Sequence, residues 1–144
     1  MINHDTIELL RECDAGIQMG ISAIDEVKDH VSNGDFKNKL DNYQREYAQL
    51  QNEIQGVLHS YNDEGKNPNP IAKGMAWMKA NFTIAVNDTD ETIADLITDG
   101  CNMGVKSLNK YLNQYKAADE RAKDFIKRLI ELQDRQLKEI RQFL

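Results

Sequence analysis

The chain has 144 residues, of which 40% are hydrophobic and 29% are charged, and its net charge is -6. This length predicts a single domain with a sizeable core. The acidic balance argues against nucleic acid as a main partner, because phosphate binding needs a basic surface, and no apolar run is long enough to span a bilayer.

The first predicted helix covers residues 5–32. Apolar or small residues recur there at alternating spacings of three and four, which is a heptad pattern. The positions are Leu10, Cys13, Ile17, Gly20, Ile24, Val27 and Val31. Asn33 and Gly34 predict the end of this helix and a tight turn.

The second predicted helix covers residues 35–62 and keeps the same spacing without a break. Its apolar positions are Phe36, Leu40, Tyr43, Tyr47, Leu50, Ile54, Val57 and Tyr61. Residues 62–70 contain both prolines and predict a loop.

A shorter helix is predicted over residues 70–85, where Pro70 suits the first helical position. One apolar stripe is expected along it, made of Ile71, Met75, Met78 and Phe82, with Trp77 beside the stripe. A helix at this place would lie outside the main bundle, so part of its apolar surface is a candidate interface: Met75, Trp77, Met78 and Phe82.

The last two predicted helices cover residues 89–116 and 118–143. The final helix has two adjacent stripes, which predict a wide buried face packed against two neighbours. They are Ile126, Ile130, Gln133, Leu137, Ile140 and Leu144, and Ala122, Phe125, Leu129, Leu132 and Gln136.

A short motif recurs 84 residues apart, with Gly16, Met19 and Gly20 matching Gly100, Met103 and Gly104. This repeat predicts two similar helical hairpins joined through residues 62–87. The expected fold is therefore all-α, a four-helix bundle spanning residues 1–144 with one long crossover, the connection found in ferritin-like proteins.

The four repeat glycines need a compensating role, because a glycine inside a helix costs about 1 kcal/mol relative to alanine. Close packing of the first and third long helices would supply one, as would room for a bulky neighbour such as Tyr43 or Tyr47. A ligand cavity is the alternative. The candidate centre comprises Gly16, Gly20, Gly100 and Gly104 with Tyr47, Cys101 and Gln133.

Several short motifs along the chain resemble a family of uncharacterised bacterial ferritin-like proteins. They are Asp14-Ala15-Gly16, the Asn-Pro loop, Gly74-Met75-Ala76-Trp77-Met78-Lys79 and Asp99-Gly100. The resemblance implies the long-crossover bundle, and it implies no known activity.

Ferritin-like proteins that bind two metal ions carry Glu-x-x-His on two of their helices. None of His4, His30 and His59 follows a Glu by three residues. No carboxylate falls on an inward position in the predicted registers, so neither a metal site nor another cofactor is expected.

No catalytic residue is predicted either. Cys13 and Cys101 are expected as small core residues, and charged residues of the last helix such as Arg128 and Arg135 as a solvated face.

These patterns predict a non-catalytic, cytoplasmic bundle that acts through protein contact, as a homodimer or larger homo-oligomer, without nucleic acid or membrane partners. Binding of a small ligand in the glycine-lined centre is the alternative. A metal-dependent oxidase or an iron store is the third and weakest hypothesis.

Overall fold

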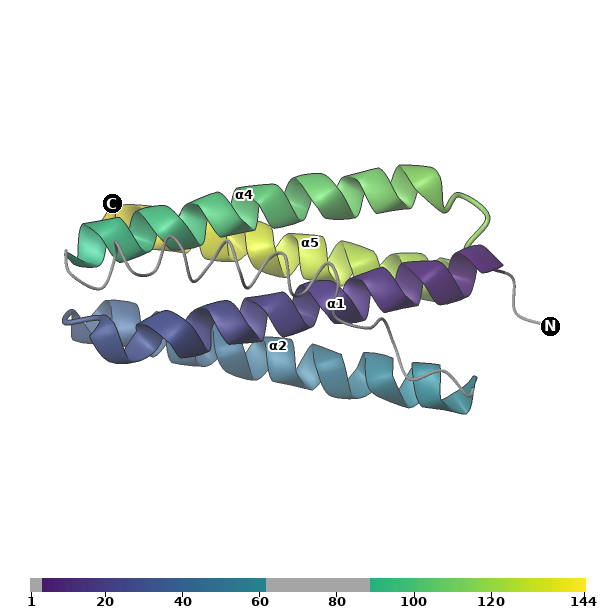
Figure 1. Ribbon diagram of the computed structural model, residues 1–144, viewed down its shortest axis with the longest axis horizontal. Coiled ribbons are helices and arrows are strands. Elements are labelled where there is room, and N and C mark those ends of the chain that lie inside the picture. Colours follow the sequence, from purple (N-terminus) through teal and green to yellow (C-terminus); the bar gives the residue numbers. More distant parts are fainter. Residues whose placement is uncertain (1–3, 62–88) are drawn as a thin grey trace.

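A computed structural model describes residues 4–61 and 89–144, and this part of the chain is entirely helical. Four long helices make up the bundle in Figure 1, which confirms the all-α prediction. They are α1 (His4–Val27), α2 (Gly34–Ser60), α4 (Asp90–Gln114) and α5 (Glu120–Ile140), with short 3-10 turns at Lys28–His30 and Arg141–Phe143.

Hydrogen bonds between the ends of the helices fix their directions. The Asp90 carboxylate, at the start of α4, accepts from the backbone N–H groups of Ser32 and Asn33, which follow α1. At the opposite end, Asp119 N–H donates to Thr6 Oγ1. The helices α1 and α5 therefore run in one direction, and α2 and α4 run in the other (Figure 1).

The core consists of the stripes that the heptad spacing predicts. Seven of the eight predicted positions of α2 are buried, and Tyr61 is partly buried. Both stripes of α5 contribute, from Ala122 and Phe125 near its start to Ile140 at its end. The prediction for Leu144 is wrong, since this residue lies beyond the end of α5 and is 56% exposed. The wide face of α5 is needed because this helix contacts α1, α2 and α4.

The helix boundaries lie within a few residues of the predicted ones, and one turn differs in its role. Asn33 is the N-cap of α2 rather than a simple stop for the helix before it, since its side chain accepts from Phe36 N–H at 3.0 Å. Asp119 caps α5 in the same way through Ala122 N–H. Each cap satisfies one N–H group that a helix start leaves without an internal partner.

The predicted helix over residues 70–85, with the candidate interface Met75, Trp77, Met78 and Phe82, lies outside the described residues. Within the described ranges, no helix carries an apolar stretch long enough to cross a bilayer.

The prediction that no carboxylate faces inward is wrong. Glu12 is 4% exposed and Asp14 is 1% exposed. Both residues flank the predicted seam position Cys13, and α1 is buried on every side over this stretch because it contacts all three other long helices. A single heptad seam describes a helix that buries one face, and α1 buries more than one here.

The charged residues Arg128 and Arg135 of α5 have specific partners across the bundle, which the sequence did not indicate. Arg128 makes a bidentate ion pair with Glu53, and Arg135 makes a bidentate ion pair with Glu46. The members are seven residues apart on each helix, so the two pairs fix the antiparallel register of α2 and α5. Both pairs are close to half exposed, so each adds at most about 1 kcal/mol.

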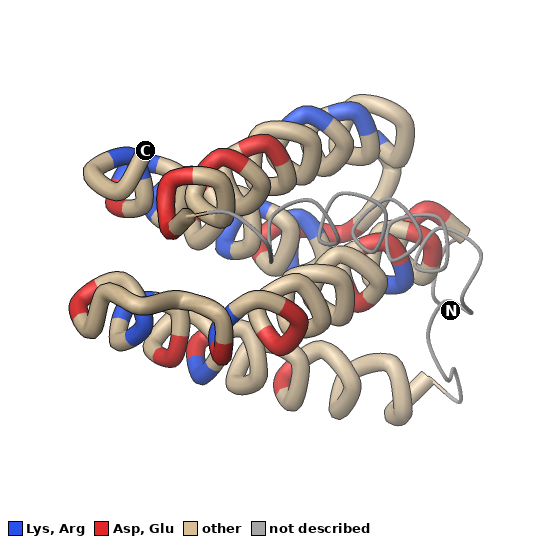
Figure 2. The backbone as a smooth tube through the Cα atoms, turned by 60° about the vertical axis from the view of Figure 1, so that its left-hand side comes forward, with Lys and Arg blue, Asp and Glu red and all other residues tan. Residues whose placement is uncertain are grey.

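Figure 2 marks the positions of the charged residues along the described helices. Acidic residues cover the first half of α4, and Lys106 and Lys110 lie in its second half. This order places negative charge near the positive end of the helix dipole and positive charge nearer the negative end.

Candidate functional site

An apolar groove lies between α1 and α4 in the described part of the chain, and we call it the α1–α4 groove. Its volume is about 390 Å³. α1 contributes Glu12, Ala15, Gly16, Met19, Gly20 and Ala23, and α4 contributes Leu96, Ile97, Gly100, Cys101, Met103, Gly104, Ser107, Leu108 and Tyr111. The floor is formed by Tyr47 of α2 and by Gln133 and Gln136 of α5.

Gly20 lacks a side chain because the ring of Tyr47 fills the space where one would lie. A Cβ atom built at Gly20 would be 2.9 Å from Tyr47 Cζ and 3.0 Å from Cε1. Tyr47 is 1% exposed, so its ring cannot turn out into solvent to relieve the contact. The glycine therefore makes room for a bulky neighbour.

Gly104 performs the same role in the other hairpin. A Cβ atom there would lie 2.9 Å from Gln133 Cδ and closer still to Oε1. The buried amide of Gln133 thus packs directly against the backbone of α4. Each of the two glycines faces a side chain from the second helix of its own hairpin, so they do not meet each other across the groove.

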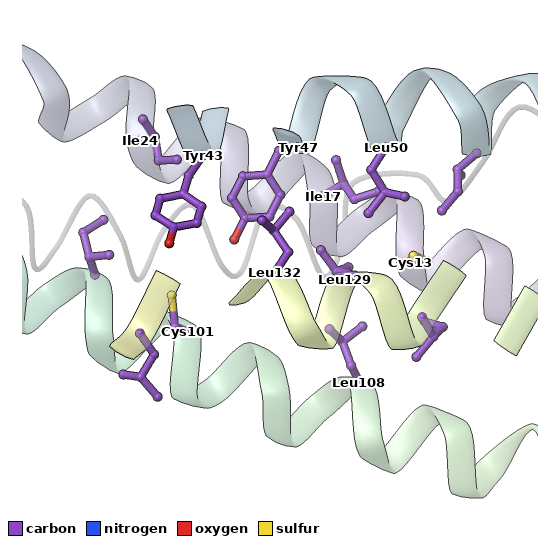
Figure 3. Close-up of a cluster of buried hydrophobic side chains, with 14 of the residues drawn as sticks. Cys13, Ile17, Ile24, Tyr43, Tyr47, Leu50, Cys101, Leu108, Leu129 and Leu132 are labelled. Atoms are coloured by element: carbon purple, nitrogen blue, oxygen red, sulfur yellow. The ribbon is translucent and has the colours of Figure 1, made fainter. Parts of the chain in front are cut away.

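A hydrogen bond between α2 and α5 closes the floor of the groove. The Tyr47 hydroxyl donates to Gln136 Oε1 at 2.6 Å. Burial raises the pKa of Tyr47 well above its usual value, while a hydrogen bond from Gln133 opposes that rise. Figure 3 shows Tyr47 extending from α2 toward α5, with the Cys101 thiol pointing up from α4.

The two thiols are free, and burial makes them poor nucleophiles. Cys13 is fully buried among core residues, and both burial and the nearby Asp14 raise its pKa. Burial raises the pKa of Cys101 to about 12. Because the thiolate is the reactive form, neither group is activated for nucleophilic attack.

Asp14 is the most unusual polar group of the described residues. Gln18 Nε2 donates to Asp14 Oδ2 at 2.8 Å, while Oδ1 is buried without a hydrogen-bond partner. Burial raises the pKa of this carboxyl, and hydrogen bonds from Gln18 and Gln55 oppose the rise. Asp14 lies outside the α1–α4 groove and bears on stability rather than on the groove's binding properties.

The described residues contain no group of three or more His, Cys, Asp or Glu side chains that could hold a metal ion. The groove itself carries one carboxylate, one thiol, one aliphatic hydroxyl, two amides and two phenols among otherwise apolar groups. What this arrangement offers chemically is a shaped apolar surface over a buried polar floor.

All seven residues of the predicted centre line the α1–α4 groove: Gly16, Gly20, Tyr47, Gly100, Cys101, Gly104 and Gln133. Gln136 stands outside the predicted centre but also lines the groove, where it accepts a hydrogen bond from Tyr47. Sequence reasoning missed the buried Asp14, for which the heptad spacing gives no signal.

Comparison of this chain with family models, with curated proteins and with solved structures finds no match. The resemblance to ferritin-like proteins stays a prediction.

Replacing Gly20 with leucine is expected to lower the free energy of unfolding by about 1–3 kcal/mol, because the new side chain must displace the buried Tyr47 ring. Gly56→Leu on α2 is the matched control, since a Cβ atom there meets nothing within 4 Å. The control should stabilise the protein by roughly 0.5–1 kcal/mol through helix propensity. Urea unfolding of both variants tests this, and equal effects at the two positions would contradict it.

Asp14→Asn is expected to stabilise the protein at pH 7 by on the order of 1 kcal/mol, because it removes a charge from a buried site. The folded-state pKa of Asp14 is raised, so the folded state binds the proton more tightly than the unfolded chain does. Wild-type stability from this group is therefore fully present below the unfolded pKa of about 3.9 and is lost as the pH rises through the folded pKa.

The advantage of Asp14→Asn over the wild type should shrink as the pH falls toward 3, which thermal unfolding across pH 3–7 measures. Asp124→Asn, at an exposed position of α5, removes the same charge without the burial. An Asp14→Asn variant less stable than the wild type at pH 7 would show that the buried charge is well compensated.

Proposed function

We propose that this protein is a non-catalytic helical bundle that acts through protein contact and associates with a second copy of itself through the face formed by α1 and α4. The observation that carries the proposal is the α1–α4 groove, an apolar concavity lined by small residues. Apolar surface that is not enclosed within one chain is typical of protein interfaces.

The opposite side of the described bundle carries charged pairs between its helices. There α2 and α5 are joined by the ion pairs Glu46–Arg135 and Glu53–Arg128, whose carboxylates and guanidinium groups satisfy each other. On the α1–α4 face, by contrast, Met103 lines the groove with 52% of its surface exposed. Methionine is enriched at interface cores because its flexible side chain adapts to a partner.

The ferritin-like connection is part of the same proposal. The helices α2 and α4 run in the same direction, so the chain leaves α2 at one end of the bundle and enters α4 at the other (Figure 1). This geometry and the motif resemblance support a long crossover through residues 62–88. The unpaired thiols of Cys13 and Cys101 favour a reducing compartment such as the cytoplasm.

Binding of a small apolar molecule is a second candidate, favoured by one observation. The groove volume of about 390 Å³ lies within the range of about 300–1,000 Å³ for small-molecule sites. Mass spectrometry of an organic extract of the purified protein separates this candidate from the first. A stoichiometric apolar compound in the extract would favour ligand binding.

The variant Met103→Asp is expected to weaken self-association at least about tenfold, because it places a charge at the centre of the proposed contact. The fold should be little affected, since Met103 is exposed by 52%. Sedimentation equilibrium at micromolar concentration measures the dimer dissociation constant.

Asn102→Asp is the matched control, since it adds the same charge to the adjacent exposed residue, which does not line the groove. The control should associate like the wild type. A wild-type protein that stays monomeric at these concentrations would reject self-association.

A further inference from the structure

The α1–α4 groove is long enough to bind a helix of about three turns. Its lining on α1 extends from Glu12 to Ala23, and on α4 from Leu96 to Tyr111. At 1.5 Å per residue these stretches are about 17 Å and about 22 Å long. The cavity is therefore a furrow along two helices.

The small residues that line the α1–α4 groove leave room for large side chains of an occupant. The α1 wall carries Ala15, Gly16 and Gly20, and the α4 wall carries Gly100 and Gly104. Close-packed helix contacts pair small residues on one side with large residues on the other. The Tyr47 hydroxyl and Gln136 Oε1 satisfy each other in the floor, so an apolar occupant need not pair with them, whereas Gln133 Oε1 is buried there without a hydrogen-bond partner.

The sequence holds one stripe of matching length that the described residues do not use. Ile71, Met75, Met78 and Phe82 recur at spacings of four and three, which places them on one face of a helix. The stripe covers twelve residues and is about 17 Å long from first to last, as is the α1 wall of the groove. Four apolar side chains at such positions are the pattern by which an amphipathic helix enters a groove.

The positions of the described helix ends allow the chain between them to reach the groove. Residue 62 follows α2 at the end of the bundle where α1 begins, and residue 88 precedes Asp90, which lies beside Ser32 at the end where α1 finishes. The length of α2, 27 residues or about 40 Å, separates these two ends. Sixteen helical residues cover about 24 Å, and the eleven others can each add up to about 3.3 Å, so the segment reaches.

We propose that the α1–α4 groove is the docking site of the chain's own residues 70–85, which insert Ile71, Met75, Met78 and Phe82 between α1 and α4. The tether makes this contact intramolecular, and a short tether gives an effective concentration in the millimolar range that a separate partner would have to exceed. Trp77 lies roughly 100° and 200° around a helix from Met78 and Met75, so docking directs it away from the groove. One groove cannot hold this segment and a second copy at the same time, so docking competes with self-association through the groove.

Cys101 supplies a built-in reporter, because it lines the groove while Cys13 does not. The experiment measures modification of each thiol by methyl methanethiosulfonate, resolved by peptide mass spectrometry. In the double variant Met75→Asp/Met78→Asp, the stripe can no longer enter an apolar groove. Cys101 should then react at least about tenfold faster than in the wild type, with Cys13 unchanged.

The double variant Lys73→Asp/Lys79→Asp is the matched control, because it adds two carboxylates to the same segment at positions off the stripe. Its Cys101 should react at the wild-type rate. An equal Cys101 rate in the stripe variant and the wild type would overturn the proposal. If both thiols accelerate together, the stripe variant has unfolded, and the milder Met75→Ala decides by the same criteria.

Two further results would overturn the proposal in favour of another occupant. Cys101 protection that increases with protein concentration would assign the groove to a second copy. Protection that is lost after refolding from denaturant in the absence of small molecules would assign it to a bound ligand. A monomer whose Cys101 is protected at every concentration would reject self-association and uphold docking, so the two proposals fail separately.

Discussion

The position of Tyr47 determines how the two hairpins meet. Its ring occupies the space beside Gly20 that any other residue would fill, and its hydroxyl reaches across the core to Gln136 of α5. A buried hydroxyl must find a partner, so this single side chain fixes the separation of α1, α2 and α5 at mid-bundle. In the other hairpin, the Gln133 amide packs against Gly104 and fixes the separation of α4 and α5.

The α1–α4 groove is a consequence of this arrangement. Gly16, Gly20 and Gly104 accept neighbours from α2 and α5, whereas a Cβ atom at Gly100 would meet nothing within 4 Å. The small residues along the two helices leave a groove between them. A second, local consequence is that α1 is covered from several directions, which buries Asp14 and Glu12. The proposals of self-association and of an intramolecular helix both start from this groove.

Periodicity was sufficient to predict the four helices and most of the core, because buried positions on a helix recur every three or four residues. The repeat glycines also identified the centre, since a glycine inside a helix needs a packing reason. Heptad spacing could not predict the partners. Tyr47 was one of two neighbours expected for the glycines, but the spacing could not choose between them. It also gave no sign that Arg128 and Arg135 pair with Glu53 and Glu46, because such pairings depend on the relative height and rotation of helices. The burial of Asp14 was not predicted for the same reason, since it depends on how many helices surround α1.

The central claim is that a satisfied polar contact under the groove holds the hairpins in register. The free energy of unfolding of Tyr47→Phe tests it most directly, because this change removes only the hydroxyl and leaves the ring against Gly20. The account predicts a loss of about 1–3 kcal/mol, since Gln136 Oε1 is then buried without its donor. A Tyr47→Phe protein as stable as the wild type, or more stable, would contradict the account.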